Sequence, residues 1–168
     1  MNMSMNMLVQ DIMDHFGVLH SLTGSRRFYT STEDSDWDHF ICCSSLSAER
    51  EVNFKTILRA LGFEMTRYGD MWPIWRYKHS DDPGQSVDLI EINTIDRFKL
   101  YVDGTQCVLK MYVQDAHFYD LLILLQRGKE RIFWDYVLNL GQRHLDQQCL
   151  EASEAAVSDL EAKLRAML

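Results

Sequence analysis

Short apolar segments of strand length recur through the first half of the chain, and they restrict the fold more than any other feature of the sequence. Five strands are predicted, at residues 18–23, 36–43, 63–67, 74–79 and 86–92. Helices are predicted at about residues 8–16 and, from a Ser47 N-cap to a Gly62 stop, at residues 47–62. This order indicates an α+β fold, in which a small mixed β-sheet carries helices on one face and a helical C-terminal part follows.

Residues 98–113 are compatible with two structures. Asp103-Gly104 lies between apolar residues, which is a hairpin signal. Phe98 and Val102 instead fit one apolar face of a helix, together with several later residues. The sequence leaves both structures open.

The C-terminal third of the chain is predicted to be helical. Residues 116–140 indicate two helices broken near Gly128, and a last helix is predicted at about residues 143–168. We therefore expect a core domain at residues 1–113 and a helical extension, residues 114–168, that packs on this core.

The last predicted helix has an apolar stripe in which Leu150, Val157 and Leu164 lie seven residues apart. A stripe of this kind is typical of a helix that docks on its own domain. It also fits a helix that contacts another chain in the manner of a coiled coil. A protein partner, or a homodimer formed through residues 143–168, is the second expectation.

Composition excludes several classes of protein. The 168-residue chain has a formal net charge of -8 and a pI near 5.1, which disfavours a binder of long nucleic acid because such a protein needs a broad basic face. The four cysteines have neither the number nor the spacing of a disulfide scaffold or a zinc site. We find no signal peptide and no apolar run near 20 residues, so we expect a soluble cytoplasmic protein without membrane contact.

A glycine-serine pair and two spaced aspartates carry the chemistry. Asp36 and Asp38 are two residues apart on a predicted strand, so their side chains point to the same face. Two adjacent carboxylates repel each other unless a cation lies between them, and oxygen ligands favour Mg²⁺ or Mn²⁺. Gly24 and Ser25, which follow the preceding strand, provide close backbone approach and a hydroxyl for phosphate oxygens.

These residues resemble a known signature. Gly24-Ser25, ten intervening residues and then Asp36-Trp37-Asp38 are similar to the motif of the DNA polymerase beta-like nucleotidyltransferase superfamily. The wider stretches at residues 23–26 and 34–38, T-G-S-R and D-S-D-W-D, resemble its small bacterial and phage members, the minimal nucleotidyltransferases. The motif covers about 15 residues, and the order of predicted elements agrees with the family core through about Ile92. The resemblance implies a sheet of the nucleotidyltransferase type.

The resemblance also implies a third carboxylate on a later strand. Asp88 and Glu91 are the two candidates, and because they are three residues apart on one predicted strand they face opposite ways. Asp88 is favoured, since an aspartate early in such a strand is closer to the family pattern. Glu91 is the alternative third metal ligand.

The mechanism that the resemblance implies uses two divalent ions, Mg²⁺ or Mn²⁺, bound by Asp36, Asp38 and the third acid. Ser25 and the Gly24 backbone would hold the β- and γ-phosphates of a nucleoside triphosphate. Arg26 would clamp a phosphate; alternatively, it is a surface arginine. In this alternative its partner is Glu33 or Asp34.

The implied activity is the transfer of a nucleoside monophosphate from a nucleoside triphosphate to a hydroxyl of a small molecule, a protein or an RNA end. The alternative is a catalytically degenerate relative that binds a protein partner through its C-terminal helix. Bulky residues at positions 27–29, Arg27, Phe28 and Tyr29, depart from the small residues usual in the family, and they would narrow the site or stack on a base.

A run of aromatic and basic residues at positions 72–78 has two interpretations. Such a run can stack on and clamp a base or an RNA end. It is also typical of a strand with one face in the core. Its members are Trp72, Trp75, Arg76, Tyr77 and Lys78.

Overall fold

The computed structural model describes residues 3–28, 31–68, 72–114, 130–145 and 149–167. The chain divides into two compact units, Met1–Phe98 and Lys99–Leu168. The first unit contains a five-stranded mixed sheet and the second contains helices. The predicted α+β fold class is confirmed.

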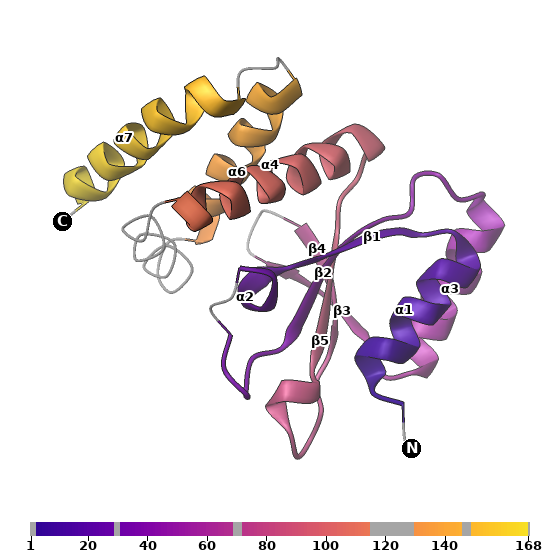
Figure 1. Cartoon of the computed structure of the whole chain (residues 1–168). Helices are drawn as coiled ribbons and strands as arrows, with labels where there is room; N and C mark the ends of the chain where they lie inside the picture. Colours follow the sequence, from indigo (N-terminus) through magenta and orange to yellow (C-terminus); the bar gives the residue numbers. More distant parts are fainter. Residues whose placement is uncertain (1–2, 29–30, 69–71, 115–129, 146–148, 168) are drawn as a thin grey trace. The chain divides into compact units, whose positions relative to one another are not determined.

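The five strands of the first unit form one sheet in the order β1-β2-β5-β4-β3 (Figure 1). β2 and β5 are parallel, and the other neighbours are antiparallel. All five predicted strands are present, with ends shifted by one or two residues. Their bounds are β1 Leu19–Thr23, β2 Trp37–Cys42, β3 Glu64–Tyr68, β4 Trp72–Tyr77 and β5 Val87–Glu91.

Two helices, α1 (Met5–Phe16) and α3 (Ala48–Ala60), lie side by side on one face of this sheet (Figure 1). Ser4 caps α1 and Ser47 caps α3, each through a side chain that accepts a hydrogen bond from a backbone N–H. The core between these helices and the sheet consists of apolar side chains that are almost fully buried. They include Val9, Met13, Ile41, Phe54, Leu58, Trp75, Val87 and Leu89.

The opposite face of the sheet receives the alternate side chains of the same strands. Residues that are directly paired in neighbouring strands point to the same face. Asp38 of β2 is paired with Asp88 of β5, and Asp88 is in turn paired with Arg76 of β4. A four-residue helix, α2 (Gly24–Arg27), follows β1 directly and contacts both β1 and β2. Charged residues therefore meet on this face, where the carboxyl end of β1 lies beside the start of β2.

Residues 98–113 form a helix and no hairpin. They belong to α4 (Ile95–Gln114), a continuous helix. A Cβ atom at Gly104 would collide with the backbone carbonyl of Val137, and one at Gly141 with that of Leu100. Gly104 thus allows α4 to approach α6 (Glu130–Leu145) closely.

The C-terminal helices begin at other positions than predicted. α6 continues to Leu145, and the last helix, α7, covers Cys149–Met167 instead of starting near residue 143. The predicted break near Gly128 lies outside the described residues. Leu160 and Leu164 of α7 are buried, and α7 contacts α6. In the parts of the chain that the structure describes, we find no helix whose length and apolar character would allow it to cross a membrane.

Candidate functional site

Three carboxylates converge on the sheet face opposite α1 and α3. Asp38 and Asp88 are paired in register on the parallel strands β2 and β5, and Asp36 immediately precedes β2. One carboxylate oxygen from each of the three lies within 4.8 Å of the other two. The structure thus brings the aspartate pair of the sequence motif together with Asp88.

Burial and mutual repulsion make this group costly to ionise fully. Asp88 keeps only 5% of its surface exposed, and Asp36 and Asp38 are half-buried. Burial raises the pKa of Asp36, and the negative charge of Asp88 raises it further, while Arg76 and Arg26 act in the opposite direction. Added positive charge would stabilise the ionised form of the cluster.

Arg76 already supplies one positive charge. Its Nε donates to Oδ1 of Asp88 and its Nη2 donates to Oδ2, both at 2.8 Å. This bidentate geometry is the strongest form of arginine–carboxylate pairing. It raises the pKa of Arg76 further above its usual value, since the hydrogen bonds to Asp88 outweigh the effect of burial.

The turn before α2 is shaped around Asp38. Gly24 has φ +68°, a conformation that side-chain-bearing residues rarely adopt, and a Cβ atom here would collide with the carboxylate of Asp38. Ser25, the next residue, is half-buried. Thr23 precedes the turn and is paired with Asp38 across the strands; its buried hydroxyl has no hydrogen-bond partner among the residues that the structure describes.

Arg26 contacts backbone carbonyls around the loop that carries Asp36. Its Nε donates to the carbonyl of Asp36 at 3.2 Å, and its Nη2 donates to those of Ser35 and Gly84. The guanidinium also lies over the ring of Trp37, 4.1 Å from the ring centre. These contacts fix the backbone beside Asp36, so Arg26 positions the loop. A phosphate clamp at Arg26 stays a prediction.

The donor set fits a hard divalent cation. The three groups are all carboxylates, and Mg²⁺ and Mn²⁺ prefer oxygen ligands from one or two acidic side chains together with substrate phosphates. At Gly24 the backbone approaches the carboxylate of Asp38 too closely for a side chain, and Thr23, whose hydroxyl has no partner among the described residues, is paired with Asp38 across the strands. Asp36, Asp38 and Asp88 are therefore the residues that could hold a metal here.

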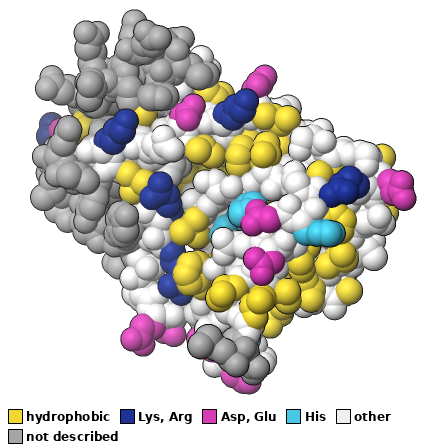
Figure 2. Space-filling model, turned by 45° about the vertical axis from the view of Figure 1, so that its right-hand side comes forward, with side chains coloured by type: hydrophobic (Ala, Val, Ile, Leu, Met, Phe, Trp, Pro, Cys, Tyr) yellow, Lys and Arg dark blue, Asp and Glu magenta, His cyan; other side chains and the backbone are white. Residues whose placement is uncertain are grey.

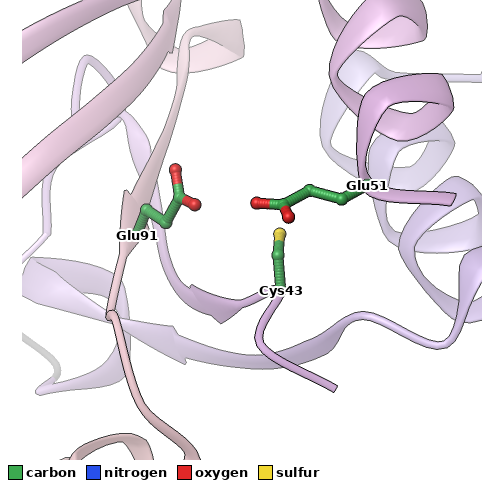
Figure 3. Close-up of side chains that lie close together, drawn as sticks. All are labelled: Cys43, Glu51 and Glu91. Atoms are coloured by element: carbon green, nitrogen blue, oxygen red, sulfur yellow. The ribbon is translucent and has the colours of Figure 1, made fainter. Parts of the chain in front are cut away.

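Glu91, the alternative third ligand, lies on the opposite face of the sheet. Figure 3 shows its carboxylate close to the side chains of Cys43 and Glu51. Lys55 of α3 binds both acids, with Nζ 2.9 Å from Glu51 and 3.0 Å from Glu91. Trp75 also donates to Glu91 through Nε1 at 3.1 Å. Alternation along β5 thus separates Asp88 from Glu91.

Lys55 supplies the positive charge in this second group. Burial raises the pKa of the Cys43 thiol to about 12, and the nearby Glu91 raises it as well, so the thiol stays protonated. Burial tends to lower the pKa of Lys55, but its hydrogen bonds to Glu51 and Glu91 outweigh this and raise it. We therefore assign the group around Lys55 to structure.

Sequence reasoning named Thr23 within the T-G-S-R stretch without giving it a role, and it did not place Arg76 beside the aspartates. Arg76 belonged to the aromatic and basic run, in which Trp75 is indeed buried in the core, 3% exposed. No signal within the sequence places Arg76 opposite Asp88, because the register between β4 and β5 depends on the loop that joins them. Phe28 is buried, 1% exposed, so it does not stack on a base; Tyr29 lies outside the described residues.

Comparisons with known proteins give distant structural similarity. No family model and no curated protein matches the sequence. Among solved structures, the chain is similar to Cid1, which has RNA terminal uridylyl transferase activity, with a TM-score of 0.47 and 18% identity over 71% of this chain and 37% of that one. A mutant of the Cid1 poly(U) polymerase bound to MgATP gives a TM-score of 0.47 and 17% identity, over 71% of this chain and 38% of that one.

A cytoplasmic RNA terminal U-transferase gives a TM-score of 0.37 and 19% identity, over 61% of this chain and 36% of that one. The chain thus spans little more than a third of the length of these solved structures. With TM-scores below 0.5, these similarities do not by themselves define what the chain does. The functional conclusion depends on the three carboxylates and the glycine turn.

Proposed function

We propose that this chain is a metal-dependent nucleotidyltransferase, which moves a nucleoside monophosphate from a nucleoside triphosphate to a hydroxyl group. The grouping of Asp36, Asp38 and Asp88, with one oxygen of each within 4.8 Å of the others, is the observation that supports this most strongly. The adjacent Gly24 turn supports it further, because this turn brings backbone directly against the carboxylate of Asp38.

The three aspartates would hold Mg²⁺ or Mn²⁺, which supplies neutralisation of phosphate charge and a lower pKa for the attacking hydroxyl. The backbone of Gly24 and the hydroxyl of Ser25 would bind the β- and γ-phosphates. The hydroxyl oxygen of the acceptor attacks the α-phosphorus, the bond from this phosphorus to the bridging oxygen breaks, and pyrophosphate leaves. The proton of the acceptor hydroxyl passes to a site carboxylate, for which Asp88 is our candidate.

The acceptor is a hydroxyl of a small molecule, a protein or an RNA end. The net charge of -8 disfavours long nucleic acid among these. Figure 2 is consistent with this: in the face it shows, the described basic side chains are scattered among acidic and apolar ones and form no broad basic area. A short RNA end needs no such area.

Pyrophosphate release tests the proposal. The protein is incubated with each nucleoside triphosphate and Mg²⁺ or Mn²⁺, alone for self-labelling and with a short RNA oligonucleotide; a label on the α-phosphate follows the transfer, and a label on the γ-phosphate follows pyrophosphate release. We expect release that is abolished in the Asp36→Ala, Asp38→Ala double variant. Asp11→Ala, which removes an exposed carboxylate on α1, is the matched control and should retain full activity.

Two results would contradict the proposal. One is release that persists undiminished in the double variant, since the activity would then come from elsewhere. The other is triphosphate binding without any release, which would make the chain the catalytically degenerate relative. A screen for protein partners of residues 143–168 would then be the next measurement.

A further inference from the structure

The third carboxylate of the proposed metal site is already bound by a cation that belongs to the protein. Arg76 donates to both oxygens of Asp88, at 2.8 Å each, across the β4–β5 pair. A carboxylate has about four lone-pair positions, and this contact occupies one on each oxygen. Any metal ion that uses Asp88 must share the carboxylate with Arg76 or replace it.

Burial explains why Asp88 needs a positively charged partner. The side chain of Asp88 is 8% exposed, and the oxygens of two further carboxylates lie within 4.8 Å of its own. A buried carboxylate among other acids requires a neighbouring positive charge. The guanidinium provides this charge to Asp88, and it is also close enough to Asp36 and Asp38 to interact with their charges.

Exposure differs between the two partners, and the more exposed arginine can leave the pair. The side chain of Arg76 is 36% exposed, against 8% for Asp88. The guanidinium can therefore move toward solvent by rotation of its own side chain, whereas Asp88 is fixed in the sheet. A divalent ion in contact with Asp88 would repel a guanidinium at hydrogen-bond distance from the same carboxylate.

We propose that Arg76 is the counter-ion of the metal-free site, and that a divalent cation bound by Asp36, Asp38 and Asp88 displaces it from Asp88. The inference depends on the proposed metal binding and is independent of nucleotidyl transfer. Arg76 keeps the site assembled before the metal arrives, and it raises the metal concentration at which the site is filled.

Direct binding of Mn²⁺ without nucleotide tests this, with free Mn²⁺ measured by its electron paramagnetic resonance signal. We expect Arg76→Gln to bind Mn²⁺ roughly tenfold more tightly than the unchanged protein, because one competing unit charge is removed. Arg59→Gln is the matched control, since it makes the same change of charge on the opposite side of the sheet, where Arg59 lies over Trp75. It should leave the affinity unchanged.

A second measurement avoids dependence on how well the variant folds. The Nε–H nuclear magnetic resonance signal of Arg76 in the unchanged protein, assigned by its absence in Arg76→Lys, should move toward the position of a solvent-exposed arginine as Mg²⁺ is added. A signal that stays in place at saturating Mg²⁺ would overturn the inference. So would equal or weaker Mn²⁺ binding by Arg76→Gln, which would make Arg76 a residue that positions Asp88 for the metal.

The outcomes separate this inference from the proposed function. Tighter Mn²⁺ binding by Arg76→Gln without any pyrophosphate release supports the displacement and contradicts the transferase. Transfer activity with no change of Mn²⁺ affinity in Arg76→Gln supports the transferase and contradicts the displacement. Failure of both proteins to bind Mn²⁺ contradicts both.

Discussion

The two faces of the sheet each carry an acidic group, and the two groups differ in how their charge is balanced. Asp88 and Glu91 are three residues apart on β5 and point to opposite faces. On the Glu91 face, Lys55 contacts both carboxylates, Glu51 and Glu91, and the third member, Cys43, stays protonated. On the Asp88 face, Arg76 donates to both oxygens of Asp88, and its charge also acts on Asp36 and Asp38.

This difference separates a structural acidic group from one suited to a ligand. The Glu91 group has one more carboxylate than cation, and it is held under α3 next to buried Trp75. The Asp88 group has three carboxylates, with Arg76 bonded to Asp88 and Arg26 near Asp36, and the backbone of the Gly24 turn lies directly against Asp38. Proximity of acidic residues alone does not distinguish the two groups; the placement of the neighbouring cations does.

The largest effect is expected when the carboxylates of one face are neutralised and compared with those of the other. Asp36→Asn with Asp38→Asn should weaken Mn²⁺ binding at least a hundredfold, since two of the three oxygen ligands lose their charge. Glu51→Gln with Glu91→Gln changes the charge equally and should leave Mn²⁺ binding unchanged. Calorimetric titration measures both, and a loss of binding in the second variant would place the metal around Cys43 instead.

The glycine turn gives the next largest effect. Gly24 and Gly17 both have positive φ, so alanine at either position should lower the free energy of unfolding by about 1–2 kcal/mol. Only at Gly24 would the new Cβ also collide with Asp38, whereas nothing lies within 4 Å at Gly17. We expect Gly24→Ala to weaken Mn²⁺ binding about tenfold as well, through displacement of one ligand.

Gly17→Ala should leave Mn²⁺ binding as it is, and urea unfolding with Mn²⁺ titration tests both variants. Equal metal affinity in the two proteins would show that the turn at Gly24 does not shape the site.

The part of the site that the sequence predicted is the part fixed by alternation along a strand. The three-residue spacing placed Asp88 and Glu91 on opposite faces of β5, and the two-residue spacing grouped Asp36 with Asp38, although Asp36 precedes the first residue of β2. Short apolar segments predicted the strands, and the cap residue Ser47 predicted the start of α3. These features depend on neighbouring residues, which a single sequence contains.

The parts that escaped prediction depend on contacts between distant elements. Arg76 meets Asp88 through the register of β4 and β5, and Lys55 meets Glu91 through the docking of α3 on the sheet. Gly104 resembled a turn residue, but its lack of a side chain serves the close approach of α6 near Val137. Neither register nor helix docking can be derived from local patterns.

Acid should lower the stability of the folded protein through His39, which lies on the helix-covered face of the sheet. Its Nε2 bonds to Oδ1 of Asn6 at 2.7 Å, and Nδ1 is buried without a partner among the described residues. Burial lowers the pKa of His39 to about 4, and nearby His20 adds to this. The unfolded chain therefore binds a proton between about pH 6.5 and 4 that the folded chain does not, so stability falls as the pH is lowered through this range.

The contribution of His39 to this loss should be about 2 kcal/mol between pH 7 and pH 5, as worked out from the two pKa values. His39→Gln can keep the hydrogen bond to Asn6 but does not titrate in this range. Between pH 7 and pH 5, the unfolding free energy of this variant should therefore fall by that amount less than in the unchanged protein. Urea unfolding at both pH values gives the comparison. An identical pH dependence in the two proteins would show that folding does not lower the pKa of His39.

The smallest effect is expected at Lys55, and it tests whether the Glu91 group is structural. Lys55→Met removes the positive charge shared by Glu51 and Glu91, and Glu91 is only 17% exposed in its side chain. Because solvent reaches both Lys55 and Glu51, we expect a loss of only about 1 kcal/mol in unfolding free energy. Lys163→Met, at an exposed position of α7, should cost less. Mn²⁺ affinity at the three aspartates should stay the same in both variants, because Lys55 and these aspartates lie on opposite faces of the sheet. A gain of Mn²⁺ binding in Lys55→Met would show that the second acidic group becomes a metal site once its lysine is removed.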